Sequence, residues 1–385
     1  MSHFSFFLPP LAPDYSGVSS VFFDLNTVTA MHDASGCTGN YTGYDEPRWY
    51  GSRAGIFCSG MRELDAIMGD DEKLIGRMIQ AKEDLNPEVL VVVGSPVPMV
   101  IGSDMKGIAM EIECRTQLPS FGFDTTGTKY YDYGVVLACN ELIDRFCEPM
   151  DIVTGRVNLV GANPLDFAKG EDLPILRALL EDAGYTVPLC LSQGYTLDQL
   201  REAASAQVNV AISRSGYLIA KHLHKRFGTP YLCALPVGSG SEVDFLDRLQ
   251  TVVKTGESAV PHQTVEGTAS TLIISEQVQG NAIRNWLASH CSVPAHVATL
   301  YGLEEELACE GDVDLPNERA IRNIAKEGHY QTIITDPCIC ELLEKYGQRN
   351  CIPLAQYAVS SRFHHKSGPF LIQQNFVSEA ALSQL

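Results

Sequence analysis

The chain has 385 residues, 45% of them hydrophobic, with a formal net charge of −19 and an isoelectric point near 4.9. This is enough apolar material for two or three domains, and the negative charge disfavours nucleic acid and membrane surfaces as partners. No apolar run approaches the roughly 18 residues of a membrane helix, and Met1 to Pro13 lacks a basic n-region, so we expect a cytoplasmic protein. Twelve cysteines scattered through apolar segments indicate reduced thiols.

The first predicted domain, residues 1–155, alternates helix and strand patterns. Apolar residues recur at helical spacing from Val18 to Leu25, and the apolar run at residues 89–93 predicts a strand buried on both faces. Further strands are expected near residues 27–32, 56–58 and 119–123, and further helices near residues 74–85, 104–114 and 133–146. This alternation is typical of a parallel sheet.

Two more βα sets follow, which we assign to residues 156–267 and 268–357. Their expected strands lie near residues 157–160, 187–191, 208–212, 231–235, 271–275, 295–300, 331–335 and 352–357. The hydrophilic stretch 254–267 is the expected linker. The predicted fold class is therefore α/β, with three Rossmann-like or flavodoxin-like βαβ domains and mostly parallel sheets. The tail 358–385 could return to the first domain.

Such sheets bind ligands outside the carboxyl ends of their strands, so the loops there are informative. The loops in question are residues 32–37, 58–61, 94–102, 124–128 and 213–216. No strand is followed by G-x-G-x-x-G, and no G-x-x-x-x-G-K-[ST] occurs. We therefore expect this chain to bind no nucleotide and to hydrolyse no ATP.

Two cysteines occupy equivalent places in the first predicted domain. Cys37 lies in a loop after one predicted strand, and Cys58 follows the next strand. Thiolates are the usual ligands of iron–sulfur clusters, and a four-iron cluster takes four ligands, so two chains could each supply a pair. From the residues alone, separate cysteines are more often packing residues. Packing is also the favoured interpretation of Cys338 and Cys340.

Other polar loops are weaker candidates for a site. Arg214 and Ser215 open a helix after the strand at 208–212, which suits an anion, although capping would explain them equally well. His364 and His365 could donate protons near neutral pH or form a solvated turn. No Ser-His-Asp order or H-E-x-x-H motif indicates a hydrolase.

Several segments resemble one known family. The loop 32–37, His-Asp-Ala-Ser-Gly-Cys, is similar to the His-Gly-Pro-x-Gly-Cys loop of nitrogenase component 1 proteins. Residues 58–69 resemble the family segment with a cysteine, then Met-x-Glu-x-Asp and Phe-Gly-Gly. Residues 100–104 look like Ile-Gly-Asp-Asp, and residues 121–127 stand where Gly-Phe-x-Gly normally lies. The resemblance covers essentially the whole chain and implies that the two cysteines above are cluster ligands.

Two departures from the family pattern matter. Ser95 and Pro96 stand where the third cluster cysteine is expected, so each chain retains two thiols. Ile212 stands where true nitrogenases have the cysteine that anchors the iron–molybdenum cofactor, two residues before an Arg-Ser pair. The chain is also shorter than true nitrogenase subunits. The resemblance therefore implies a nitrogenase-like reductase of a small molecule such as a tetrapyrrole, and not a dinitrogen-reducing subunit.

The resemblance also implies partners and roles. Two chains, identical or paralogous, would share one [4Fe-4S] cluster through Cys37 and Cys58 of each and accept electrons from an ATP-hydrolysing iron protein. His32, Arg214 and His365 would orient or protonate the substrate in the cleft between the domains. One competing hypothesis is a scaffold that assembles or carries a metallocofactor without turnover, and another is a cluster-free binding protein.

Overall fold

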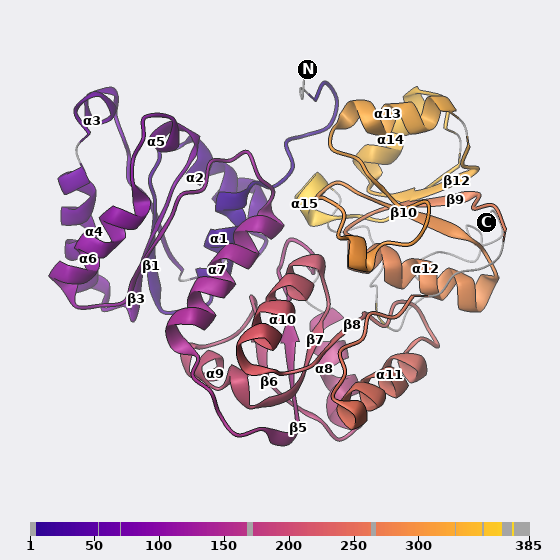
Figure 1. The fold of residues 1–385 in the computed structure, drawn as a ribbon. Helices are drawn as coiled ribbons and strands as arrows, with labels where there is room; N and C mark the ends of the chain where they lie inside the picture. The colour runs from indigo at the N-terminus through magenta and orange to yellow at the C-terminus, as the bar shows by residue number, and fades with distance from the viewer. Residues whose placement is uncertain are drawn as a thin grey trace.

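A computed structural model of the chain describes residues 5–52, 54–69, 71–167, 172–262, 267–327, 329–348, 350–363 and 372. The strands of these residues form three sheets whose ladders are all parallel, and each sheet with its helices makes one lobe of the molecule (Figure 1). This confirms the predicted fold class. No helix in the described part of the chain combines the length and the apolar composition that crossing a membrane requires.

The first lobe has the strand order β2-β1-β3-β4. Its strands are β1 (Thr27–Met31), β2 (Gly55–Cys58), β3 (Val89–Val93) and β4 (Ser120–Phe123). Its helices are α1 (Asp14–Phe22), α2 (Gly36–Asn40), the π-helical turn η1 (Tyr41–Asp45), α3 (Glu63–Met68), α4 (Asp71–Leu85), α5 (Pro96–Val100), α6 (Met105–Thr116) and α7 (Tyr131–Phe146). In β3, Leu90 and Val92 pack with α4 and α6, whereas Val89, Val91 and Val93 share a core with α1 and α7. The strand is therefore buried on both faces, as predicted.

Helices α1 and α7 approach each other closely at two glycines. A Cβ at Gly17 would lie 1.9 Å from the carbonyl oxygen of Tyr131, and one at Gly134 would lie 1.9 Å from that of Asp14. The Asp14 carboxylate also accepts a hydrogen bond of 2.8 Å from the N–H of Gly127, in the loop after β4. These contacts fix the start of α1 beside the carboxyl edge of the first sheet.

The second lobe has the strand order β6-β5-β7-β8. Its strands are β5 (Val153–Val160), β6 (Thr186–Leu191), β7 (Ala206–Ala211) and β8 (Tyr231–Cys233). Its helices are α8 (Asp172–Asp182), α9 (Leu197–Arg201), the 3₁₀ turn η2 (Ala203–Ser205), α10 (Arg214–Phe227) and α11 (Glu242–Thr255). β5 begins at Val153, within the range 1–155 expected for the first domain. The division of the chain into three domains at the expected boundaries stays a prediction.

The third lobe has the strand order β11-β10-β9-β12-β13. Its strands are β9 (Thr271–Ile274), β10 (Ala295–Thr299), β11 (Val313–Asp314), β12 (Thr332–Thr335) and β13 (Cys351–Pro353). Its helices are α12 (Gln277–Cys291), the 3₁₀ turn η3 (Glu305–Leu307), α13 (Glu318–Glu327), α14 (Pro337–Lys345) and α15 (Tyr357–Ser360). This lobe lies beside the second one, opposite the first (Figure 1).

The N-terminal segment joins the first lobe to the third. The backbone N–H groups of residues 6–8 all donate to Oε2 of Glu318, the first residue of α13, at 2.8 to 3.1 Å. The N–H of Ala12 donates to the carbonyl oxygen of Ala358 in α15 at 3.1 Å. Figure 1 shows this segment leaving α1 and running toward α13. The first lobe is therefore attached to both of the others.

Candidate functional site

The loops after the strands of the first lobe meet at the carboxyl edge of its sheet. Cys37 lies in α2, after β1, and Cys58 ends β2, where it pairs in register with Met31 at the end of β1. Both cysteines are partly exposed. Both also contact Asp33. Cys58 Sγ lies 3.4 Å from the backbone oxygen of Asp33, and the Asp33 side chain hydrogen-bonds the Cys37 thiol. The structure thus brings the two predicted ligands together on one accessible edge.

The turn that presents Cys37 is held by Asp33. Its Oδ2 accepts hydrogen bonds from the N–H groups of Ser35 and Thr38, at 2.9 and 3.1 Å. Ser35 has φ = 122°, a conformation that residues other than glycine rarely adopt. Such strained residues persist only where their surroundings hold them, and they cluster at functional sites.

The Cys37 thiol lies among oxygen groups. Burial raises its pKa and the charge of Asp33 adds to this, while the hydrogen bond from Tyr15 opposes the rise. Because the pKa stays above its usual value of about 8.5, the free thiol is protonated at neutral pH, and a metal must displace that proton. Ser95, at the position of the missing third cysteine, donates from Oγ to the carbonyl oxygen of His32 at 2.8 Å.

His32 lies at this same edge, not between the lobes. Its side chain is buried, and Nδ1 lies 2.9 Å from Ser59 Oγ, which accepts a hydrogen bond from the Asp33 N–H. Burial lowers the pKa of His32, against the charges of nearby aspartates that raise it. The imidazole is therefore neutral at pH 7.

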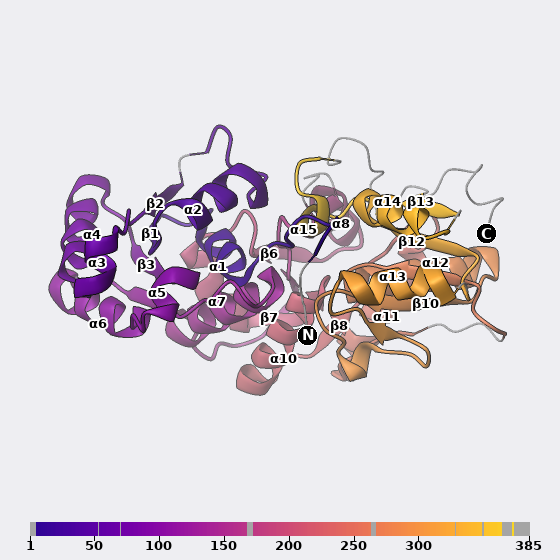
Figure 2. The same cartoon turned by 90° about the horizontal axis from the view of Figure 1, so that it is seen from above.

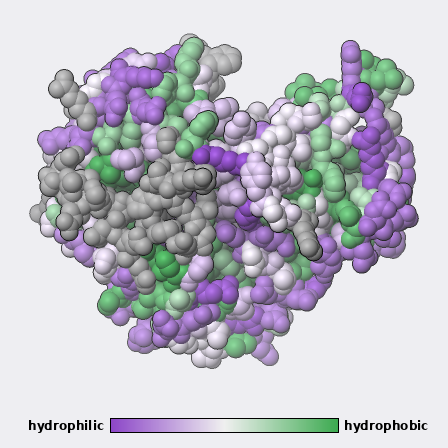
Figure 3. Space-filling model, turned by 180° about the vertical axis from the view of Figure 1, so that it is seen from behind, coloured by the Kyte–Doolittle hydropathy of each residue, from purple (hydrophilic) through white to green (hydrophobic). Residues whose placement is uncertain are grey.

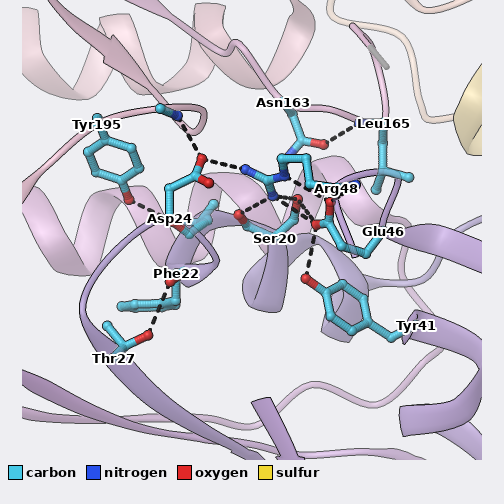
Figure 4. Close-up of polar contacts among 12 residues, drawn as sticks. Ser20, Phe22, Asp24, Thr27, Tyr41, Glu46, Arg48, Asn163, Leu165 and Tyr195 are labelled. Atoms are coloured by element: carbon cyan, nitrogen blue, oxygen red, sulfur yellow. Dashed lines mark hydrogen bonds and ion pairs between the residues drawn. The ribbon is translucent and has the colours of Figure 1, made fainter. Parts of the chain in front are cut away.

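A partly buried ion network fixes the segment that follows Cys37 (Figure 4). The guanidinium of Arg48 bonds to Asp24 at 2.6 Å and to Glu46 at 2.8 Å. The Tyr41 hydroxyl donates to Glu46 at 3.0 Å, and Asp24 also accepts a hydrogen bond of 2.6 Å from the N–H of Gly194 in the second lobe. The network ties η1 and the residues after it to α1 and to the neighbouring lobe.

Arg214 lies where the three lobes meet. It begins α10 after β7, as expected, and its guanidinium pairs with Asp132 of α7 and with Glu304 of the third lobe. Its backbone N–H donates to Glu276, which caps α12. Arg214 therefore contacts groups from the first and third lobes. His365, the third predicted catalytic residue, lies outside the described residues.

The donor set at the cysteine edge fits an iron–sulfur cluster only if two chains share it. Among the described residues, no group of three or more His, Cys, Asp or Glu side chains could hold a metal ion. A four-iron cluster takes four protein ligands, and this edge supplies the two thiols of Cys37 and Cys58. One chain alone would leave such a cluster half ligated.

Comparison with known proteins addresses the family. The sequence description of one family, the nitrogenase component 1 type oxidoreductases, matches residues 14–270. The chain belongs to this family. The resemblance inferred from the cysteine loops is thereby confirmed, and the family supports an oxidoreductase or a related scaffold.

Individual members of the nitrogenase component 1 family show how distant the chain is from its relatives. It is 21% identical over 210 residues to a subunit of the light-independent protochlorophyllide reductase from Nostoc punctiforme, a match that covers 51% of this chain and 41% of the relative. It is 26% identical over 242 residues to the nitrogenase iron-molybdenum cofactor biosynthesis protein NifE of Methanosarcina barkeri, covering 57% of this chain and 50% of NifE. The match thus spans about half or less of the curated relatives. A nitrogenase Cp1 structure shares the fold, with a TM-score of 0.70 at 12% identity over 98% of this chain and 92% of that one.

An exposed apolar surface of the chain flanks Cys37 and Cys58. It comes from α3, which follows the Cys58 loop, and from α5, which follows Ser95. Figure 1 draws both helices at the upper end of the first lobe, Figure 2 looks down on that end, and hydrophobic colour marks it at the upper right of Figure 3. Its exposed residues are Leu64, Ile67, Met68, Val97, Val100 and Ile101. Exposed apolar patches of this kind mark interaction surfaces.

Sequence reasoning missed several groups around Arg214. Asp166 is partly buried, its Oδ1 accepts a hydrogen bond from the Tyr131 hydroxyl, and its Oδ2 is buried and has no partner among the described residues. Burial and the charge of Glu276 raise the pKa of Asp166 well above its usual value. Asp132 also escaped notice, because a single acidic residue in a helical pattern carries no signal of its distant partner.

Proposed function

We propose that this chain is the catalytic component of a nitrogenase-like reductase. Two copies, or one copy and a paralogous chain, hold one [4Fe-4S] cluster through Cys37 and Cys58 of each chain, accept low-potential electrons from an ATP-hydrolysing iron protein, and reduce a small molecule such as a tetrapyrrole. The observation that carries the proposal is the pair of accessible thiols on one sheet edge beside an apolar surface.

The groups around Cys37 have defined roles in this proposal. Bound to the four thiolates, the cluster supplies one-electron transfer at low potential. On binding iron the Cys37 thiol would lose its proton, and the hydroxyl of Tyr15 would donate a hydrogen bond to the resulting thiolate. Asp33 keeps the turn that aims Cys37 outward.

The predicted catalytic residues divide between two places. His32, neutral and hydrogen-bonded to Ser59, is suited to handling a proton next to the cysteines. Arg214 faces the junction of the lobes. To bind a substrate there, its guanidinium would have to give up its ion pair with Asp132 or with Glu304. We keep His365 as a third residue that orients or protonates the substrate.

Two arguments support the partners. Low-potential electron delivery needs an energy input, and the sequence has no phosphate-binding loop, so a separate protein would hydrolyse ATP. The apolar residues of α3 and α5 surround the edge at which a second chain would supply the remaining ligands. A dimer across this patch would bury them together with the cluster.

The second candidate function is a scaffold that carries a metallocofactor without turnover. The similarity to NifE, a cofactor biosynthesis protein, favours it. Both functions use the same cysteines, but only for the reductase would the iron-protein partner hydrolyse ATP in a substrate-dependent way. Transfer of bound metal to an acceptor protein without such ATP use would select the scaffold.

The test is anaerobic reconstitution with iron and sulfide, followed by metal analysis, EPR and size-exclusion chromatography. The wild type should hold about four irons per dimer, and Cys37→Ser or Cys58→Ser should lose most of them. Cys114→Ser is the matched control, because Cys114 is an exposed cysteine on α6, and it should bind iron like the wild type. Wild-type protein that is folded and dimeric but free of metal would refute the proposal.

The same preparations test the apolar surface. Val100 is 86% exposed on the proposed interface, so Val100→Glu should shift the dimer toward the monomer and lower the iron content with it. Val243→Glu is the control, because Val243 is 68% exposed on α11 of the second lobe. A dimer that tolerates Val100→Glu would place the interface elsewhere.

A further inference from the structure

A cavity separate from the cysteine edge lies between the second and third lobes. It has a volume of about 210 Å³ and opens at the carboxyl end of β8, where parallel sheets commonly bind ligands. Its walls come from α11 and α12, with Val260 and Pro261 closing one side. None of the residues assigned above to the cysteines or to Arg214 lines it, so this site does not rest on the proposed function.

The cavity walls are mostly apolar and rigidly held. Val237, Phe245, Ala282 and Trp286 line it and are all buried. The indole Nε1 donates to the backbone oxygen of Ser239 at 3.1 Å. The aromatic wall is therefore fixed in place before any ligand arrives.

Close backbone packing keeps the loop after β8 against that wall. Gly238 has φ = 75°, and a Cβ there would lie 2.4 Å from Trp286 Nε1. Gly240 has φ = 90°, and a Cβ there would lie 2.8 Å from His290 Nε2. The His290 ring stacks on Trp286, with centroids 5.2 Å apart and an interplanar angle of 14°. Only glycine allows the loop to lie this close to the two rings.

Arg248 lies at the rim of the cavity and has hydrogen-bond donors that no contact among the described residues uses. Arg248 Nε donates to Asp244 at 2.7 Å, and both residues line the cavity. No hydrogen bond or ion pair within the described part of the chain uses the two terminal nitrogens of Arg248. A guanidinium presents such nitrogens as a planar fork that matches a carboxylate.

The size of the cavity limits the apolar part of a ligand. A cavity of about 150 Å³ lined by Leu, Ile and Phe accommodates benzene, so about 210 Å³ holds one ring and a short chain. We propose that this cavity binds a small organic acid, with an aromatic or branched apolar body against Trp286 and Phe245 and its carboxylate on Arg248.

Tryptophan fluorescence tests the proposal directly. The chain has two tryptophans, so Trp49→Phe leaves Trp286 as the single reporter. Titration of the full-length protein with 3-phenylpropionate should change its emission saturably, and 3-phenylpropanol should bind about tenfold more weakly, because it lacks the charge-assisted bonds. Arg248→Gln should reduce the acid to the affinity of the alcohol. Ala282→Leu, which fills the cavity, should abolish both responses.

Each other outcome contradicts the proposal. If the emission does not respond saturably to the acid, the cavity is not a binding site for it. If the acid and the alcohol bind with equal affinity, Arg248 does not bind the carboxylate. Unchanged binding in folded Ala282→Leu would place the ligand elsewhere. If Ala282→Leu fails to fold by circular dichroism, Arg248→Gln decides the question, because Arg248 lies on the rim and an unaltered preference for the acid in that variant refutes the proposal.

Discussion

Replacing Arg214 by methionine should cost about 3–5 kcal/mol of folding free energy, the usual result of removing one partner from a buried ion pair. The side chain of Asp132 is 5% exposed, so its carboxylate would lose its cation and could not turn to water. Lys221→Met is the matched control on the same helix. Lys221 pairs with Glu306 of the third lobe, but these side chains are 41% and 62% exposed, so the loss should be about 0–1 kcal/mol.

The assay is urea unfolding of the reduced, metal-free protein at pH 5 and pH 8. Burial raises the pKa of Asp132 and Arg214 opposes the rise. Without Arg214, the folded state binds a proton at pH values where the unfolded state has released it, so stability falls as the pH rises. The cost of Arg214→Met should therefore be smaller at pH 5 than at pH 8. A cost equal to that of Lys221→Met, or one that grows toward pH 5, would refute the reasoning.

Two further perturbations follow from packing and burial. In urea unfolding, Gly134→Ala should destabilise the protein by about 3 kcal/mol or more, because the new methyl group would meet the backbone of Asp14. The control Gly76→Ala, in open space on α4, should be neutral or stabilising by up to about 1 kcal/mol. Equal effects of the two substitutions would contradict the close approach of α1 and α7. Burial raises the pKa of Asp45 to about 6, so the stability of the wild type relative to Asp45→Asn should fall by up to about 3 kcal/mol as the pH rises from about 4 to about 7, and a difference that does not vary with pH would show that this carboxyl titrates normally.

The sequence predicted the regular parts of the fold well, for a physical reason. A strand buried on both faces is apolar throughout, and β3 matches the predicted range 89–93. The short elements were missed. α5 contains Pro96 and Pro98, which favour a loop interpretation, although proline is acceptable in a first helical turn. The π-helical turn η1 depends on Arg48 and Glu46, whose contacts no local pattern reveals.

The candidate site was predictable only in part. Cys37 and Cys58 follow adjacent strands, so the topology of a parallel sheet places them at one edge. Arg214 was found by its place after a strand, but its partners Asp132 and Glu304 lie 82 and 90 residues away in the chain. Tyr15 sits on a helix far from any motif, and only the packing of α1 brings it to Cys37.

The attachment of residues 6–8 to Glu318 and of Ala12 to Ala358 closes the three lobes into a ring. In an open string of three bodies, either hinge can swing alone. In a closed linkage, no pair can separate without stretching or bending the third connection. Any opening at the centre, where Arg214 lies, therefore requires all three lobes to move together. The N-terminal segment limits how far the first and third lobes can separate.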